Sequence, residues 1–308
     1  MTPVHATEGV CQFEVTLPGP LDIATSLEPF RRSGDDLLDR WDGSRLLRTL
    51  PIGGRTIPYA AQIRGTVAAP ALLAQIERPE DRAPVEAALH LTFMRAPEEE
   101  YAALLARDPV IAALDARYPG LRPARQFGLF AALVRCISAQ QVNLRWATTT
   151  RRRLAEAFGE RHQVGAHEVY SLSAQWVAGA SVAELRALQF TTRKAEYLIG
   201  AAGEIASGAL DAETLAALPD EQVIARLVAL RGIGRWSAEW ILARTLGRPC
   251  VVAGDLAVRK VVARAYLDYA PGATLPDEVA IRRATAHWGA AAGVAQGLLL
   301  HSYGAEPA

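Results

Sequence analysis

The sequence predicts a mainly α-helical protein that begins with a small α+β domain carrying an antiparallel sheet. Alanine is frequent, and most long segments lack runs of β-branched residues, which favours helix. Before about residue 98, short alternating segments stand between Gly- and Pro-containing turns, whereas apolar residues recur at helical spacing after it. These observations divide the chain into an N-terminal α+β domain, residues 1–97, and a helical domain, residues 98–308.

The N-terminal domain shows a mixture of strand and helix patterns. Residues 13–17 alternate between apolar and polar side chains, and residues 22–39 look helical. The segments 45–50, 56–66 and 85–93 have the pattern of strands or of mixed elements. We therefore expect a small antiparallel sheet here.

The remaining chain is predicted to be helical. Residues 98–107 and 109–118 form two short helices, and residues 127–158 carry an apolar face that includes Phe127, Phe130, Val134 and Ile137. Further short helices are expected at 181–188, 192–207, 212–217, 220–230, 236–246, 256–268 and 277–287.

Composition excludes several classes of protein. Thirty-three basic residues balance 33 acidic ones, so any binding of nucleic acid must depend on local sites rather than on overall charge. The three cysteines, Cys11, Cys136 and Cys250, lie far apart, which argues against a disulfide framework and against an iron–sulfur cluster. The N-terminal residues 1–10 have no signal-peptide pattern, and no apolar stretch is long enough to span a membrane.

A Gly-Ile-Gly hairpin at residues 232–234, inside a helical pair spanning 220–246, is the most informative segment. Gly232 and Gly234 let the backbone adopt positive φ and approach another molecule, while Ile233 anchors the turn. The helix that begins at Arg235 presents free N–H groups and its dipole to a phosphate oxygen. The alternative is a plain turn between two helices, with a glycine C-cap and no ligand.

Asp255 is the candidate catalytic residue. It follows Gly234 by 21 positions, in the string Gly-Asp-Leu-Ala-Val-Arg-Lys at 254–260. A lone Asp before a helix is usually an N-cap, but the two roles are compatible. A carboxylate at a helix N-terminus can remain ionised and can stabilise a positively charged sugar or activate water.

Together, these segments resemble the helix–hairpin–helix (HhH-GPD) superfamily of base-excision glycosylases, and most of all AlkA-type 3-methyladenine DNA glycosylase II. The resemblance also covers residues 108–111, 118–123, 138–142 and 193–198. It implies an α+β domain before residue 98 and two helical lobes with a DNA cleft between them. It also implies an alkali-metal ion under the hairpin, on the main-chain carbonyls of Val228, Leu230 and Ile233; no other cofactor is expected.

The resemblance assigns roles to individual residues. Bifunctional glycosylase/lyases have a lysine two positions after the second hairpin glycine, where this chain has Trp236, so we expect hydrolysis without strand cleavage. Trp236 and Trp240 match aromatic positions of the base pocket, although two Trp at helical spacing also suit core packing. Leu300 replaces a further pocket tryptophan. Gln141 falls at the position of the residue that fills the gap left by the flipped base, although a capped turn with exposed glutamines explains it equally well.

The sequence thus predicts a cytoplasmic, monomeric enzyme, associated with the nucleoid if the source is prokaryotic. It would bind double-stranded DNA with damaged bases, have no contact with membranes and excise alkylated bases such as 3-methyladenine and 7-methylguanine. The alternatives are a glycosylase for oxidised or mispaired bases, a non-catalytic DNA-binding module that keeps only the hairpin, and a purely structural helical protein.

Overall fold

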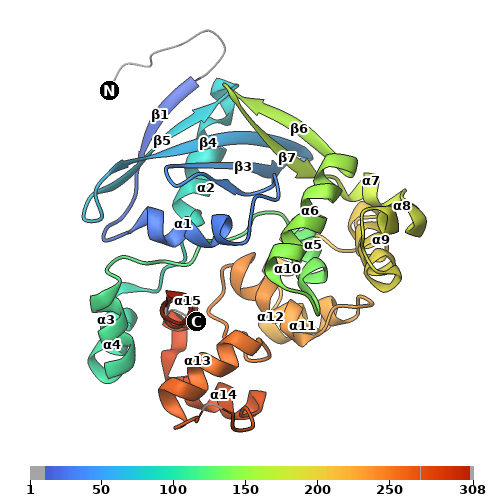
Figure 1. Cartoon of the computed structure of the whole chain (residues 1–308). Coiled ribbons are helices and arrows are strands. Elements are labelled where there is room, and N and C mark those ends of the chain that lie inside the picture. The colour runs from blue at the N-terminus through green and yellow to red at the C-terminus, as the bar shows by residue number, and fades with distance from the viewer. Residues whose placement is uncertain (1–10, 271, 306–308) are drawn as a thin grey trace.

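The computed structural model describes residues 11–270 and 272–305 (Figure 1). The first ten residues, on which the expected absence of a signal peptide rests, lie outside this range. A sheet occupies the upper part of the molecule in Figure 1, and helices fill the rest. The predicted fold class, mainly α with a small antiparallel sheet near the N-terminus, is confirmed.

The N-terminal sheet has five antiparallel strands in the order β1-β5-β4-β3-β2. The strands are β1 (Cys11–Thr16), β2 (Arg40–Trp41), β3 (Arg45–Ile52), β4 (Arg55–Gly65) and β5 (Pro70–Ile76). The tight β3–β4 turn places Gly53 and Gly54 at φ of 57° and 76°, which glycine adopts without strain. Alternate side chains along these paired strands face the same side of the sheet and form one core.

Helices α1 (Ile23–Arg32) and α2 (Arg82–Thr92) pack against the sheet through that core. Residues 85–93, read as strand or mixed structure from the sequence, are therefore mostly helix. The correction has a simple reason, because Val85 and Leu89 are four apart and both are fully buried against the strands. The helix expected over 22–39 is also shorter, since it ends before Gly34, whose φ is 108°.

The helical part contains the predicted helices in order, together with two helices, at 174–178 and 292–305, that were not predicted. Its helices are α3 (Glu98–Arg107), α4 (Pro109–Arg117), α5 (Leu129–Ala139), α6 (Leu144–Phe158), α7 (Ala174–Ala178), α8 (Val182–Ala187), α9 (Thr192–Ala206), α10 (Ala212–Ala217), α11 (Asp220–Val228), α12 (Arg235–Arg244), α13 (Leu256–Tyr266), α14 (Glu278–Thr285) and α15 (Ala292–Ala305). Two 3₁₀ segments, η1 (Pro79–Asp81) and η2 (Ala286–Ala291), precede α2 and α15.

The stretch 127–158 is two helices rather than one. It breaks between α5 and α6 because Gln141 has a φ of 55° and Asn143 caps the new helix by accepting from the Trp146 amide at 2.8 Å. A two-stranded hairpin, β6 (Gly159–Val164) and β7 (His167–Leu172), follows and was not predicted. Its buried Val164 and Val169 pack on strands β3 and β4 of the N-terminal sheet.

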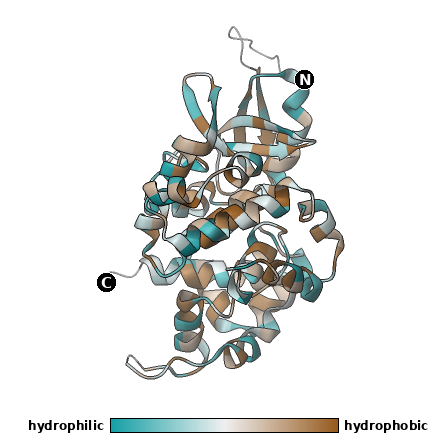
Figure 2. Ribbon diagram, turned by 90° about the vertical axis from the view of Figure 1, so that its right-hand side faces the viewer, coloured by the Kyte–Doolittle hydropathy of each residue, from teal (hydrophilic) through white to brown (hydrophobic). Residues whose placement is uncertain are grey.

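The helices form two hydrophobic cores. One core joins α5, α9, α11 and α12, and the other joins α3, α4, α13 and α15. In the hydropathy-coloured view of Figure 2, hydrophobic residues gather on helices in the interior of the molecule. Among the described residues, no helix is long and apolar enough to cross a membrane.

Candidate active site

The hairpin between α11 and α12 has the two glycines in different conformations. Gly232 has a φ of 89°, and an added Cβ would lie 2.2 Å from ring carbons of Tyr197, so both backbone and packing require glycine. Gly234 has an ordinary φ of −93°, and an added Cβ would meet no atom within 4 Å. The expectation of positive φ at both glycines is therefore wrong for Gly234, which instead leaves open space in front of α12.

That open space faces the start of α12. No side chain caps this helix, so its first N–H groups remain available to an anion. Ile233 is buried and its amide donates to the Leu230 carbonyl at 3.1 Å, which closes the turn. The Arg235 guanidinium is held by Glu239 at 2.8 Å and Glu221 at 2.9 Å. The guanidinium of Arg235 is therefore engaged in ion pairs, whereas no side chain occupies the N–H groups of the first turn of α12.

Asp255 stands at the N-cap of α13. Its Oδ1 accepts from the amides of Ala257 at 2.8 Å and Val258 at 3.0 Å. Its Oδ2 accepts from the indole N–H of Trp236 at 3.0 Å. These three donors leave lone pairs on the carboxylate for a water molecule. The predicted N-cap role of Asp255 is thus confirmed, and the geometry leaves room for the predicted catalytic role.

The loop before Asp255 is fixed from two sides. The Val252 amide donates to Oε1 of Gln296 on α15 at 2.8 Å. An added Cβ at Gly254 would lie 3.1 Å from Oε1 of Glu278 and 3.4 Å from Cβ of Trp236. The loop thus lies in van der Waals range of the Trp236 side chain, next to the contact between Trp236 and Asp255.

A cavity of about 440 Å³ opens beside this carboxylate. Asp255, Trp236, Trp240 and Leu300 all line it, so the structure brings the predicted catalytic and pocket residues together. The volume lies within the range of ligand pockets. Trp236 and Trp240 are half-buried: both pack against the core that joins α5, α9, α11 and α12, and both also line the cavity, so core packing and a pocket role occur together.

Arg244 is a pocket residue that sequence reasoning missed. It continues the row of Trp236 and Trp240 on α12 at a spacing of four residues, which is the signal that could have found it. Its Nη1 lies 3.5 Å from the Ala124 carbonyl and 3.8 Å from Sδ of Met94, both long contacts. Burial lowers the pKa of Arg244 to about 10, and the Asp255 carboxylate opposes this shift. The side chain is therefore a cation at neutral pH.

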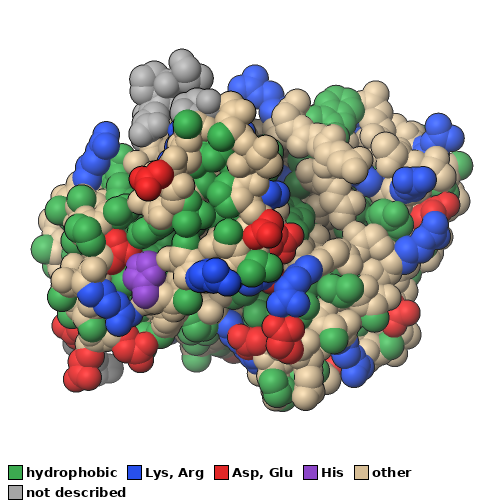
Figure 3. All heavy atoms as spheres, turned by 90° about the horizontal axis from the view of Figure 1, so that it is seen from below, with side chains coloured by type: hydrophobic (Ala, Val, Ile, Leu, Met, Phe, Trp, Pro, Cys, Tyr) green, Lys and Arg blue, Asp and Glu red, His purple; other side chains and the backbone are tan. Residues whose placement is uncertain are grey.

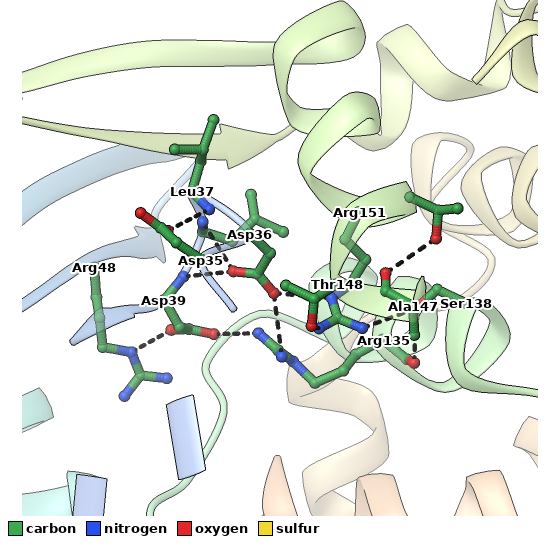
Figure 4. A network of polar contacts seen from close by, with 12 residues as sticks. Asp35, Asp36, Leu37, Asp39, Arg48, Arg135, Ser138, Ala147, Thr148 and Arg151 are labelled. Carbon is green, nitrogen blue, oxygen red and sulfur yellow. Dashed lines mark hydrogen bonds and ion pairs between the residues drawn. The ribbon is translucent and has the colours of Figure 1, made fainter. Parts of the chain in front are cut away.

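A buried ion network (Figure 4) borders the cavity, which Asp36, Arg135 and Arg151 line. Asp36 accepts from Arg151 at 2.8 Å and lies 3.3 Å from Arg135. Arg135 also reaches Asp39 at 2.8 Å, and Asp39 reaches Arg48 at 2.5 Å. The network ties the segment after α1 to α5 and α6, so the N-terminal domain supplies part of the pocket.

The turn that carries Gln141 is held against the hairpin. Gln141 is exposed, and its φ of 55° is a strained conformation for a residue other than glycine. The neighbouring Gln140 donates from Nε2 to the Gly232 carbonyl at 2.8 Å, and Nζ of Lys194 donates to the Ser138 carbonyl at 2.8 Å. These contacts fix the candidate wedge relative to the hairpin that precedes α12.

Two histidines near the C-terminus have different environments. His287 binds Asp108 at 2.7 Å, away from the cavity. His301 lines the cavity and packs edge-on against Tyr118, with ring centroids 4.7 Å apart. Burial, aided by Arg32, lowers the pKa of His301. The side chain is thus largely neutral at pH 7, which makes it a poor general acid.

The described residues contain no cluster of three His, Cys, Asp or Glu side chains that could hold a metal ion. Cys11, Cys136 and Cys250 are free thiols. Burial raises the pKa of Cys136 and of Cys250 to about 12, so neither is a reactive thiolate at neutral pH.

Comparisons with known proteins identify the family of this chain. The model of the "HhH-GPD superfamily base excision DNA repair protein" family matches residues 134–294. DNA-3-methyladenine glycosylase of Bacillus subtilis (strain 168) is 31% identical over 143 residues, 46% of this chain and 47% of the relative. DNA-3-methyladenine glycosylase 2 of Escherichia coli (strain K12) is 32% identical over 133 residues, 42% of this chain and 46% of the relative. The chain thus matches about half the length of these curated relatives.

The solved structure of a 3-methyladenine DNA-glycosylase from Archaeoglobus fulgidus has the same fold, with a TM-score of 0.81 at 21% sequence identity. The alignment covers 96% of this chain and all of that one, so the likeness includes the N-terminal sheet. The family model includes α12, the hairpin and Asp255 and spans more than half of the sequence. The chain therefore belongs to the HhH-GPD superfamily of base excision DNA repair proteins.

Proposed function

We propose that this protein is a monofunctional DNA glycosylase that removes alkylated bases from double-stranded DNA by hydrolysis of the N-glycosidic bond. The observation that carries the proposal is the Asp255 carboxylate, held by Trp236 and the start of α13 at the edge of a cavity of base-accommodating size. The names of the partial relatives, 3-methyladenine glycosylases, support the choice of alkylated bases.

In the proposed reaction, a flipped nucleotide places its base in the cavity and its sugar beside Asp255. The bond between C1′ and the base nitrogen breaks, and both electrons stay with the base. The carboxylate stabilises the positive charge that develops on the sugar and orients water for attack. Water adds to C1′ through its oxygen and releases one proton, for which Asp255 is the nearest base.

An alkylated purine that carries a positive charge becomes neutral when it receives these electrons. Such a base needs little help to leave, which suits a cavity whose histidine is largely neutral. Stacking on Trp236 and Trp240 would favour an electron-poor base through cation–π attraction. The positive charge of Arg244 acts in the opposite direction and favours bases that present hydrogen-bond acceptors.

The distribution of lysines supports hydrolysis without lyase chemistry. The chain has two lysines, Lys194 and Lys260, and neither is among the residues that line the cavity. Trp236 occupies the position where lyases of the superfamily are expected to carry a Schiff-base lysine. Borohydride should therefore trap no covalent adduct with DNA, and a trapped adduct would contradict the monofunctional assignment.

A base-release assay tests the proposed function. Duplexes with 3-methyladenine, 7-methylguanine, hypoxanthine or 8-oxoguanine are incubated with the wild-type protein and with Asp255→Asn. We expect release of the methylated purines and a loss of about 10³-fold or more in the variant, with DNA binding preserved. Release of 8-oxoguanine without release of methylated purines would overturn the substrate assignment. Full activity of Asp255→Asn would overturn the mechanism.

We further propose that the enzyme acts as a cytoplasmic monomer with one hairpin-bound alkali-metal ion. The three free thiols suit a reducing compartment. The Val228 carbonyl, at the end of α11, has no partner within its helix, which suits a role as ion ligand. The Leu230 carbonyl accepts from Ile233 and keeps a second lone pair.

A further inference from the structure

DNA binding by a chain of zero net charge requires local sites. On the face shown in Figure 3, basic and acidic side chains are interspersed, and no large patch of one sign is visible. The hairpin can supply backbone donors for one phosphate, but a duplex bent around a flipped nucleotide needs contacts on more than one side. A second concentration of positive charge next to the base pocket would supply such contacts.

A groove between the end of α1 and the first half of α6 has this property. It has a volume of about 380 Å³, and four arginines line it, two from each helix: Arg31, Arg32, Arg145 and Arg152. Asp35 is the one carboxylate among its lining residues, and Arg40 neutralises it at 2.7 Å. We call this feature the arginine groove.

The α6 side of the groove is one continuous helix face. Arg145, Thr148, Thr149 and Arg152 are spaced at i, i+3, i+4 and i+7, so they point in the same direction. At 1.5 Å per residue, the two arginines are separated by about 10 Å along the helix. Successive phosphates of one strand are about 3.4 Å apart along the duplex axis, so this face can follow a strand over several phosphates.

These arginines are available to a ligand. Arg145 is exposed and has no ion-pair partner within the described chain. Arg31 pairs with Glu28 at 2.9 Å and Arg152 with Glu156 at 3.0 Å, and about half of each arginine side chain remains exposed. Surface pairs of this type contribute little free energy, so a phosphate can replace or share the carboxylate. Guanidinium groups bind phosphate in a bidentate geometry.

The groove opens directly onto the base pocket. Arg32, Ser33 and Thr148 line both cavities. The α6 face begins just after Gln141, the candidate wedge, and Leu144 between them also lines the base pocket. Trp236 and Asp255 line the base pocket from the hairpin side. The pocket therefore lies between the hairpin and the arginine groove.

We propose that the arginine groove binds the sugar–phosphate backbone of the duplex next to the flipped nucleotide. The ligand class is a DNA phosphodiester, and the inference rests on the proposed glycosylase function. The hairpin would hold the backbone through amides and the groove through guanidinium groups, so the two sites together would position the sugar over Asp255. This arrangement assigns a DNA-binding role to the N-terminal domain, through Arg31 and Arg32 of α1.

Salt-dependent DNA binding by matched variants tests the proposal. Arg145→Gln and Arg152→Gln are compared with Arg82→Gln, a control outside the groove on α2. Arg82 pairs with Glu86 at i, i+4 just as Arg152 pairs with Glu156, and the two arginines have similar exposures of 54% and 49%. The Kd for a duplex with a central abasic-site analogue is measured at several salt concentrations, and thermal unfolding checks that each variant is folded.

Each groove variant should weaken binding about 3- to 10-fold at low salt and reduce the slope of log Kd against log salt by about 0.9, the value for one lost phosphate contact. Arg82→Gln should change neither quantity. Unchanged Kd and slope in both groove variants, with normal base release, would overturn the groove while leaving the glycosylase function intact. Absence of base release with the expected slope changes would refute the glycosylase and support the groove. If inorganic phosphate alone protects the wild type but not the groove variants against heat, and the slopes for DNA are unchanged, the site binds small anions and the proposal is wrong.

Discussion

The indole nitrogen of Trp236 lies 3.0 Å from Oδ2 of Asp255, so the side chain that forms the wall of the base pocket also holds the catalytic candidate. Two amides of α13 hold the other carboxylate oxygen. The carboxylate plane is therefore fixed from α12 and from α13 together. The two residues lie 19 positions apart in sequence.

Trp236→Phe should lower the rate of base release while preserving an aromatic wall. The variant removes one hydrogen bond to a charged group, a change of about 1.5–3 kcal/mol and hence about 10- to 100-fold in kcat. Single-turnover release of 7-methylguanine measures the effect. Trp240→Phe is the matched control, because Trp240 lies one turn further along the same helix and makes no hydrogen bond to Asp255 in the described structure. Equal losses in both variants would assign Trp236 to stacking alone.

The residues that the sequence predicted best are those with a local signal. The hairpin, the N-cap character of Asp255 and the row of Trp236 and Trp240 follow from spacing and capping rules that act over a few residues. Most helix positions were predictable for the same reason. The positive φ expected at Gly234 failed because a glycine pattern does not show which of two glycines takes the strained conformation.

The features that the sequence did not predict depend on distant contacts. The β6–β7 hairpin is stable because Val164 and Val169 pack on a sheet formed about 100 residues earlier. Segment 85–93 has strand-compatible residues, and its burial against that sheet selects the helix. The role of Arg135 in the buried ion network cannot be predicted from the sequence, because its partner Asp36 is about 100 residues away and only the fold brings the two together.

Arg244→Met should shift the base preference toward cationic bases. The guanidinium is a cation at neutral pH, with its pKa lowered by burial to about 10, and it lines the cavity with Asp255. Its removal relieves repulsion of 7-methylguanine and removes a donor for neutral bases such as hypoxanthine. We expect the ratio of hypoxanthine to 7-methylguanine release to fall about 10-fold, the effect of one charged hydrogen bond. Arg244→Lys keeps the charge and should keep most of the ratio. A parallel loss for both bases in Arg244→Met would indicate a packing role only.

Gln141→Gly should make the protein more stable and less active. Glycine relieves the positive φ of 55°, which stabilises the fold by about 1 kcal/mol, but it removes the candidate wedge. Gln189 offers a control, because it is an exposed glutamine with a φ of 72° in another turn; its side chain accepts an exposed hydrogen bond from Arg153, whose loss should reduce the gain only slightly. Gln189→Gly should give a similar gain in urea unfolding with unchanged base release. Normal release by Gln141→Gly would exclude Gln141 as the wedge.

The ion network in the pocket wall should make stability depend on pH through Asp36. Burial raises the pKa of this carboxyl, but Arg135 and Arg151 outweigh it and hold the pKa at about 2, below the ordinary value of 3.8. Because the folded-state pKa is depressed, the stabilisation is present above about pH 4 and is lost as the pH falls toward 2. The shift corresponds to about 2 kcal/mol.

Asp36→Asn should therefore destabilise the protein by roughly 3 kcal/mol at pH 7, because two buried guanidinium groups lose their shared counter-ion. The neighbouring Asp35→Asn removes a more exposed carboxylate that pairs with Arg40, and it should cost less than about 1 kcal/mol. Urea unfolding at pH 7, 5 and 3 compares both variants with the wild type. The deficit of Asp36→Asn should shrink at pH 3, because Asp36 of the unfolded wild-type chain is mostly protonated there while that of the folded protein is still mostly ionised. A deficit that stays constant from pH 7 to pH 3, or one no larger than that of Asp35→Asn, would show that the network does not hold the pocket wall through this charge.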